Sequence, residues 1–428
     1  MKDTKDGAVL YRNGTPFFIK GVGGRNYLAE LEKIGGNTIR IYDTTDIRNT
    51  LDEALKYNLA VIVDIPLYRF QTAHNPYRHK ENVQLLKKSV EDLVKKYKDH
   101  PALLFWNLGN ELQYPTIIEK NKIAENFSDL KRIASQLVNR RSFIKTFNEL
   151  VDFIHEEDPN HPVSTSIATH YFWKRVLSIH LFSPDLDLIG YNIFAPPKKI
   201  NFDLQRLSKI IDLMPCYISE WGIEGPWAQE RTLWGAPIEQ TSTKKAEQYR
   251  SNYQTFIEDY DKLLGGAVFF WGQKQEVTHT WFNIFDEKGR KSETYYELEH
   301  IWKNSKTQSD FPLRIKYMLV NEKGARNNIF FKPNELVNAK IFLENNRDST
   351  LQFNWEIFEE EWNYPGGGVA HQRPKQIFDC FEENRNDTVI SFKTPKIEGP
   401  YRIFAYVYDQ EGNFVTTNTP FYILNPDE

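Results

Sequence analysis

Short apolar runs alternate with helical patterns through the first 300 or so residues of this 428-residue chain. Eight of these runs are continuously apolar, which is typical of parallel strands that are covered on both faces. The predicted strands are 17–22, 38–42, 60–65, 102–107, 163–167, 186–191, 216–219 and 266–271. The predicted helices are 27–34, 47–57, 82–97, 117–157, 204–211 and 244–264. Eight such units over about 290 residues predict an α/β fold, a (β/α)8 TIM barrel.

An open, doubly wound sheet is the alternative architecture for the same pattern. Its phosphate-binding turn needs a Gly-x-Gly-x-x-Gly spacing after the first strand. This chain has Gly21-Val22-Gly23-Gly24 there. The glycine spacing therefore favours the barrel.

The pattern changes after residue 303, where the polar stretch 304–310 reads as a linker. The helical period then disappears, and several of the runs that follow alternate apolar with polar residues. These runs predict strands at 313–320, 336–343, 351–358, 388–392, 401–408 and 419–424. We therefore expect a catalytic TIM-barrel domain over 1–303, a linker over 304–310 and an all-β immunoglobulin-like sandwich over 311–428.

Composition narrows the possible partners. The chain has 54 Lys and Arg against 58 Asp and Glu, so it offers no basic face to nucleic acid. No apolar run approaches the ~20 residues of a membrane-spanning helix. The two cysteines argue against a disulfide framework, and no His, Asp or Glu cluster indicates a metal, so we expect no cofactor. Aromatic residues make up 14%, which suits both protein cores and sugar-binding clefts.

The amino terminus runs from Met1-Lys2-Asp3 into polar sequence without the apolar core of a signal peptide. The expected location is the cytoplasm, or the periplasm or the outside of the cell if a signal peptide has been removed. The sequence sets no oligomeric state.

A glutamate stands just beyond each of two predicted strands on opposite sides of the barrel. Glu111 follows the fourth strand in Gly109-Asn110-Glu111, and Glu220 follows the seventh in Ser219-Glu220. Functional groups of such barrels lie at the carboxyl ends of the strands, so these two side chains can face each other across the mouth. One protonated and one ionised carboxyl group are the minimal machinery of glycoside hydrolysis. A lone glutamate in such a position more commonly caps a helix or forms a salt bridge.

The stretch from Lys98 to Glu111 resembles the acid/base strand of clan A glycoside hydrolases, and the closest resemblance is to the catalytic barrel of glycoside hydrolase family 2. Residues 218–222 resemble that family's nucleophile strand, 11–22 its barrel entry and 285–296 its barrel exit. The chain departs from the family in two ways. Family 2 enzymes usually carry sandwich domains before the barrel, and they commonly have an Asn-His pair where this chain has Gly-Val-Gly-Gly. Residues 38–43 also resemble fungal-type β-1,3-glucanosyltransferases of the same clan.

The resemblance implies a retaining glycosidase with Glu111 as general acid/base and Glu220 as nucleophile. Asn110 would then donate its amide to the 2-hydroxyl of the sugar. Arg40 would keep Glu220 ionised, whereas a purely structural salt bridge from Arg40 to Asp64 is the alternative interpretation.

Other residues are predicted to bind the substrate. Tyr191 would hydrogen-bond Glu220, with Asn192 as the neighbouring candidate. His170 would reach the sugar or the acid/base, unless it is an ordinary polar loop residue. The predicted substrate-binding residues are Arg40, Asn110, His170, Tyr191, Asn192, Trp221 and Trp271.

Tryptophans extend the predicted substrate-binding surface. Trp271 would form the floor of the subsite that holds the cleaved sugar, or else pack in the core. The loop after Glu220 carries Trp221, Trp227 and Trp234 over about 23 residues, and long loops in compact domains are usually functional. We interpret this loop as a wall of further sugar subsites.

The predicted function is therefore retaining hydrolysis of a β-linked oligo- or polysaccharide by double displacement. A β-glucan transglycosylase that uses the same site and a non-catalytic carbohydrate-binding protein are the alternatives. In the sandwich, Trp355, Trp362 and Tyr364 are candidate polysaccharide ligands, with core or interface packing as the more ordinary role.

Overall fold

The computed structural model describes residues 1–4, 7–69, 75–116, 127–194, 198–255, 263–305, 311, 313–345, 350–361, 372–381 and 386–425. The chain divides into two compact units, 1–221 with 254–269 and 222–253 with 270–428. The three segments predicted from the sequence stay a prediction, and most of the predicted linker lies outside the described residues.

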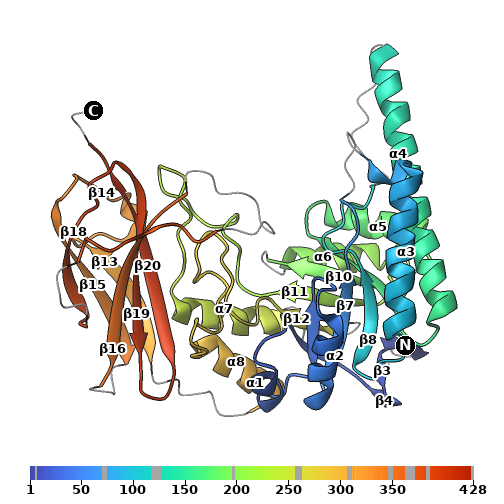
Figure 1. Ribbon diagram of the computed structural model, residues 1–428, viewed down its shortest axis with the longest axis horizontal. Coiled ribbons are helices and arrows are strands. Elements are labelled where there is room, and N and C mark those ends of the chain that lie inside the picture. Colours follow the sequence, from blue (N-terminus) through green and yellow to red (C-terminus); the bar gives the residue numbers. More distant parts are fainter. Residues whose placement is uncertain are drawn as a thin grey trace. The chain divides into compact units, whose positions relative to one another are not determined.

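The first unit holds a closed barrel of eight parallel strands in the order β10-β11-β12-β5-β6-β7-β8-β9 (Figure 1). These strands are β5 (Ile19–Gly23), β6 (Thr38–Ile41), β7 (Ala60–Ile65), β8 (Leu103–Leu108), β9 (Val163–Ala168), β10 (Leu188–Ile193), β11 (Cys216–Trp221) and β12 (Leu263–Val268). Its helices are α1 (Leu28–Lys33), α2 (Ile47–Lys56), α3 (Lys80–Tyr97), α4 (Phe127–Glu157), α5 (Phe172–Phe182) and α6 (Lys198–Leu207). Two hairpins precede the barrel, β1 (Lys2–Thr4) with β2 (Gly7–Val9) and β3 (Tyr11–Arg12) with β4 (Thr15–Pro16).

This architecture confirms the predicted barrel, with errors at particular elements. The helix predicted at 204–211 corresponds to α6, but α6 ends at Leu207. The prediction counts Ile210 as part of its apolar face, whereas the structure leaves Ile210 exposed. The predicted end of the 244–264 helix is wrong because Leu263 and Leu264 begin β12. Helix α5 was not predicted, since apolar residues such as Leu181 also occupy its exposed face and hide the period.

The barrel interior is layered along its axis. The amino-terminal halves of the strands contribute an apolar floor of Ile19, Ala60, Ile62, Leu104, Phe105, Leu188, Tyr217 and Leu264. Toward the carboxyl ends the buried side chains become polar, among them Arg40, Asp64 and Asn107. The floor excludes water from below, so the polar layer must satisfy its own charges and hydrogen bonds.

The second unit contains helices α7 (Ser242–Tyr253) and α8 (Glu293–Trp302) and two sheets (Figure 1). One sheet has the order β13 (Arg314–Val320), β15 (Leu336–Asn345), β18 (Val389–Lys393). The other has the order β14 (Phe330–Phe331), β20 (Phe414–Ile423), β19 (Gly399–Tyr408), β16 (Gln352–Glu359), β17 (Gln376–Ile377). A 3-10 turn also occurs here at Ala325–Asn327, and another at Pro76–Arg78 belongs to the first unit.

One apolar core draws on both sheets, for example through Ile315, Trp355 and Phe421. This is an all-β sandwich, as predicted, and it is consistent with an immunoglobulin-like domain. Trp355 is fully buried in that core, whereas Trp362 and Tyr364 lie outside the described residues. The last strand begins at Phe414 rather than 419, because polar residues such as Asn418 are buried there by hydrogen bonds.

Candidate active site

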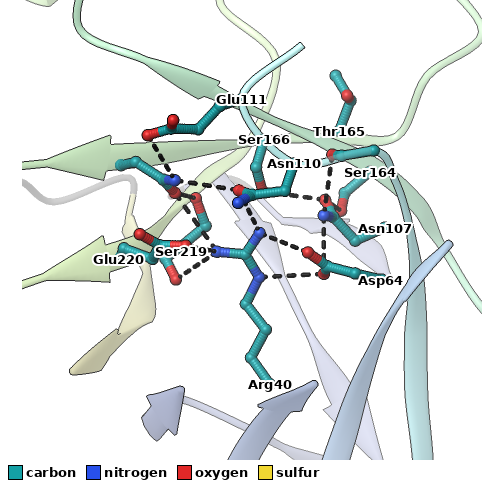
Figure 2. A network of polar contacts seen from close by, with 12 residues as sticks. Arg40, Asp64, Asn107, Asn110, Glu111, Ser164, Thr165, Ser166, Ser219 and Glu220 are labelled. Carbon is teal, nitrogen blue, oxygen red and sulfur yellow. Dashed lines mark hydrogen bonds and ion pairs between the residues drawn. The ribbon is translucent and has the colours of Figure 1, made fainter. Parts of the chain in front are cut away.

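Arg40 stands at the centre of a polar network at the carboxyl ends of the barrel strands (Figure 2). Its side chain is fully buried and binds Asp64 twice, from Nε to Oδ1 at 3.0 Å and from Nη2 to Oδ2 at 2.7 Å. Its Nη1 donates to Oε1 of Glu220 at 3.1 Å and to the carbonyl oxygen of Ser219 at 2.9 Å. The arginine thus makes both contacts that the sequence offered as alternatives.

Asn110 has a fixed orientation in this network. Its Oδ1 accepts hydrogen bonds from Nη2 of Arg40 at 2.8 Å and from Nδ2 of Asn192 at 3.0 Å. Since two donors hold the oxygen, the amide nitrogen must point the other way. Asn110 is exposed, so this NH2 group can donate to a bound hydroxyl.

Glu111 lies on an exposed turn after β8. Its backbone is left-handed, with φ 50°, and it follows Gly109 with φ 77°. A Cβ at Gly109 would come within 2.6 Å of the Leu112 side chain, so the turn needs glycine there. The N–H of Leu112 donates to the carbonyl of Ser166 on β9 at 3.2 Å, and Nδ2 of Asn192 donates to Oε1 of Glu111 at 3.2 Å. Such a strained non-glycine residue is a common mark of a functional site.

Glu220 reaches the network because β11 carries a bulge. Between the pairs Gly190–Tyr217 and Asn192–Glu220, two residue steps on β10 oppose three on β11. The register also shifts on the β12 side of the same strand. The extra residue lets Ser219 and Glu220 both contribute to one polar cluster, which regular alternation would not permit. Glu220 is 4% exposed.

Tyr42 lies beside Glu220 at the end of β6. Its hydroxyl lies over Gly23, where an added Cβ would come within 2.2 Å of the hydroxyl oxygen. Burial raises the pKa of Tyr42 well above its usual value, and the negative charge of Glu220 raises it further. The phenol therefore stays protonated, and its hydroxyl is buried without a hydrogen-bond partner among the described residues.

The charge of Arg40 is permanent. Burial alone would lower the pKa of its guanidinium, but Asp64, Tyr217, Tyr42 and Glu220 together raise it well above the usual value. Burial raises the pKa of Asp64, and Arg40 opposes that shift. A fixed cation therefore stands between two carboxylates, holding Asp64 in a bidentate pair and Glu220 by one hydrogen bond. A positive charge at this distance stabilises the ionised form of Glu220.

The structure brings five of the predicted site residues into one network: Arg40, Asn110, Glu111, Asn192 and Glu220. Tyr191 precedes Asn192 on β10 and is buried. Its ring packs edge-to-face on Phe172 of α5, with centroids 4.9 Å apart. Successive side chains on a strand point to opposite faces, and Asn192 is the residue of this pair that hydrogen-bonds Asn110 and Glu111. The hydrogen bond between Tyr191 and Glu220 stays a prediction.

His170 and Trp221 have other surroundings. His170 is exposed, and its ring centroid lies 4.0 Å from that of Tyr171. Trp221 is fully buried, and its ring lies close to the backbone of Gly266 on β12. Substrate binding by these two residues stays a prediction.

The remaining predicted tryptophans belong to the second unit. Trp271 lies three residues beyond β12 and packs against Phe285 and Tyr295, with ring centroids 4.9 and 6.1 Å away. Trp234 packs on two aromatic rings of the sandwich, whereas Trp227 is 44% exposed. Their roles as sugar subsites stay predictions.

Sequence reasoning missed Asn107, which organises the far side of the network. Its Nδ2 donates to Oδ1 of Asp64 at 2.8 Å, and its Oδ1 accepts from the hydroxyls of Ser164 and Ser166 at 2.7 and 3.1 Å. The available signal was a polar residue inside a continuously apolar strand. Asp64 in Ala-Val-Ile-Val-Asp-Ile and Asn107 in Leu-Leu-Phe-Trp-Asn-Leu both carry that signal.

The described residues contain no group of three or more His, Cys, Asp or Glu side chains placed to hold a metal ion. None of their helices is long and apolar enough to span a membrane.

No protein-family model and no curated protein matches the sequence. Solved structures do match. Bacteroides uniformis beta-glucuronidase 2, covalently bound to cyclophellitol-6-carboxylate aziridine, aligns with a TM-score of 0.50 and 14% identity over 96% of this chain and 46% of that one. A GH2 beta-galacturonidase from Eisenbergiella tayi, bound to glycerol, aligns with a TM-score of 0.50 and 15% identity over 70% of this chain and 53% of that one.

The chain spans about half the length of these solved structures. At this identity the likeness shows the fold. The chain therefore has the barrel fold that these two solved structures contain, which confirms the predicted barrel.

Proposed function

We propose that this protein is a retaining β-glycoside hydrolase with Glu220 as nucleophile and Glu111 as general acid/base. The observation that carries the proposal is the single hydrogen-bonded network that links these two carboxyl groups. Arg40 bonds Glu220 and Asn110, and Asn192 bonds Asn110 and Glu111. The network lies at the carboxyl ends of the strands, where barrels of this fold carry their chemistry.

In the first step an oxygen of Glu220 attacks the anomeric carbon of the sugar. A bond forms between that oxygen and the carbon while the glycosidic C–O bond breaks, and Glu111 gives its proton to the departing oxygen. Arg40 holds the attacking carboxylate ionised and oriented. The NH2 group of Asn110 donates to the 2-hydroxyl, a bond that strengthens in the transition state.

In the second step Glu111 acts as base. It takes a proton from water, whose oxygen attacks the anomeric carbon and breaks its bond to Glu220. The enzyme returns to its first state, and the product keeps the β configuration because two inversions have occurred.

The decisive experiment traps the intermediate. The protein is incubated with activated 2-deoxy-2-fluoro β-glycosides from a panel of neutral and acidic sugars, and the adduct is located by mass spectrometry of peptides. We expect the adduct on Glu220 and none in Glu220→Gln. The matched control is Glu224→Gln, which removes a carboxyl group from the loop after β11. This variant should still be labelled on Glu220. An adduct at another residue, or turnover by Glu220→Gln, contradicts the assignment.

A second variant tests Glu111. In Glu111→Ala, turnover of an activated aryl glycoside should fall and then recover with sodium azide, giving a β-glycosyl azide as product. An α-glycosyl azide or no recovery would contradict the role of Glu111. Product analysis also separates the alternatives: chains longer than the donor identify a transglycosylase, and saccharide binding without turnover of any panel member identifies a binding protein.

A further inference from the structure

Arg175 is a buried arginine that the Arg40 network does not use. It lies in the first turn of α5, on the face that also buries Phe172, Val176 and Ile179. It is 8% exposed. In the part of the chain that the structure describes, its Nε is buried without a hydrogen-bond partner and its guanidinium forms no ion pair.

This placement is costly for the folded protein. A buried cation loses hydration that only an anion or several acceptors restore. The amino-terminal turn of a helix also carries partial positive charge, which disfavours a cation there. Burial lowers the pKa of Arg175, and the carboxylate that opposes this shift is Glu111. A charge kept at such a cost is a candidate for binding an anion from outside.

Chain connectivity places Arg175 and Glu111 at the same end of the barrel. The turn that carries Glu111 is hydrogen-bonded to Ser166 near the end of β9, through Leu112 and Gly109. Helix α5 begins at Phe172, four residues after β9 ends. Both segments are therefore anchored at the carboxyl end of the same strand. Arg40 thus bonds Glu220, whereas Arg175 lies at the strand end that also anchors the turn of Glu111.

We propose that Arg175 binds an anionic group, a carboxylate or a sulfate, on the part of the substrate that departs. This rests on the proposed function, in which Glu111 protonates the leaving oxygen, so a cation beside Glu111 lies on the leaving-group side. A guanidinium pairs with either anion through two parallel hydrogen bonds. The substrate class is therefore an acidic β-linked saccharide with its negative charge on the leaving side.

The residues around Arg175 fit such a ligand. Tyr171 precedes Arg175 by four residues, the spacing of neighbours on one side of a helix, and is 58% exposed, so its ring offers a surface on which a sugar can pack. The Nζ of Lys174 lies 5.7 Å from the centroid of this ring and adds a second positive charge there.

The kinetic test compares two leaving groups on the same glycosyl unit, 4-nitrophenol and 3-carboxy-4-nitrophenol. We expect Arg175→Met to lower kcat/KM for the carboxylated substrate about 10- to 100-fold, and for the neutral one less than about 3-fold. Arg175→Lys should recover part of the loss. Arg206→Met, an exposed cation on α6, is the control and should change neither value. An equal loss on both substrates would overturn the proposal and leave the hydrolase function standing.

The binding test does not depend on turnover. Cellobionate and lactobionate carry a carboxylate on the leaving side of a β-linkage, and cellobiose and lactose are their neutral counterparts. In calorimetric titration we expect the wild-type protein to bind an acid more tightly than its neutral counterpart, and Arg175→Met to lose that preference. No preference in the wild-type protein overturns the role of Arg175, even when the neutral aryl glycoside is hydrolysed. Preference without hydrolysis of any aryl glycoside overturns the proposed function instead.

Discussion

Each of the two units holds a buried ionic network built around an arginine. The two networks differ in whether their outermost residues are exposed to solvent. In the second unit, Arg402 binds Glu360 through Nε at 2.8 Å and through Nη2. Its Nη1 donates to Oδ1 of Asn418 at 2.7 Å, and its Nη2 also donates to the carbonyl oxygen of Pro237 at 2.8 Å. Asn418 continues the network to Glu239 at 2.6 Å.

Glu239 is enclosed on every side. Its carboxylate accepts hydrogen bonds from Lys245, Thr278 and Thr280 as well as from Asn418. Burial alone would raise the pKa of Glu239, but Lys245 and the other donors lower it below the usual value. All of these side chains are buried.

The Arg40 network, in contrast, ends at the exposed residues Asn110 and Glu111. The two arginines have similar surroundings, because each guanidinium group is buried against a carboxylate. Arg40 binds both oxygens of Asp64, and Arg402 contacts Glu360 through two of its nitrogen atoms. A network whose members are all buried can only hold its segments together, whereas one with exposed members can also bind and react. The comparison predicts that mutations in the first unit change activity and those in the second change stability.

The largest expected effect is on activity. Glu220→Gln should lower kcat/KM for the best aryl glycoside by at least about 10^4-fold, because no covalent intermediate can form. Its midpoint of urea unfolding should move little, since the amide oxygen can still accept from Arg40. Steady-state kinetics and a denaturation curve on the same preparation check this, and a large stability loss with only mild kinetic change would break the comparison.

Glu239→Gln should show the opposite behaviour. It leaves Lys245 buried without its anion, which costs about 3–5 kcal/mol of unfolding free energy. Below the unfolding temperature, kcat/KM should stay within about 3-fold of the wild-type value. Glu230→Gln, whose partner Arg326 is exposed, is the control and should change stability by less than about 1 kcal/mol.

A pH effect on stability sharpens the comparison within the second unit. Burial raises the pKa of Glu293 from 4.5 to about 7, with Arg314 opposing the shift and Glu297 adding to it. Arg314 is shared with Glu247 and Glu344, so Glu293 is less well compensated than Glu239.

The raised pKa sets the sign of this effect. Between pH 4.5 and about 7 the unfolded chain has released this proton while the folded chain still holds it, so stability falls as pH rises through this window, by about 3 kcal/mol in all. Urea unfolding at several pH values should show this fall, and Glu293→Gln should remove its part of it. An unchanged pH dependence in that variant would contradict the shift.

The smallest predicted effect concerns the neighbour of the nucleophile. Gly23→Ala places a methyl group where the hydroxyl of Tyr42 lies, so the phenol must move away from Glu220. We expect about a 10-fold loss of kcat, because the displaced phenol changes the surroundings of the nucleophile. Tyr42→Phe should cause a similar loss, and the double variant should be no worse than either single one. Additive losses would show that Gly23 acts by another route.

Local pattern was enough to predict the barrel and the positions of both carboxylates. Strands such as β7 and β8 are continuous apolar runs, and their ends mark where side chains leave the core. Glu111 and Glu220 could be found because the carboxyl end of a strand is a property of the chain order. The same logic placed Arg40 inside the barrel, since β6 is buried along its whole length.

The direction of each side chain was decided only by tertiary structure. The bulge in β11 depends on pairing with both neighbouring strands, and it brings Ser219 and Glu220 into one cluster. The pairing of β10 with β11 brings Asn192 to that cluster, where it accepts from Ser219 and donates to Glu111. Arg175 carries no sequence signal, because an arginine in a helix is ordinarily a surface residue. Sequence sets the order and period of the elements, whereas register and packing between distant segments determine which charges meet.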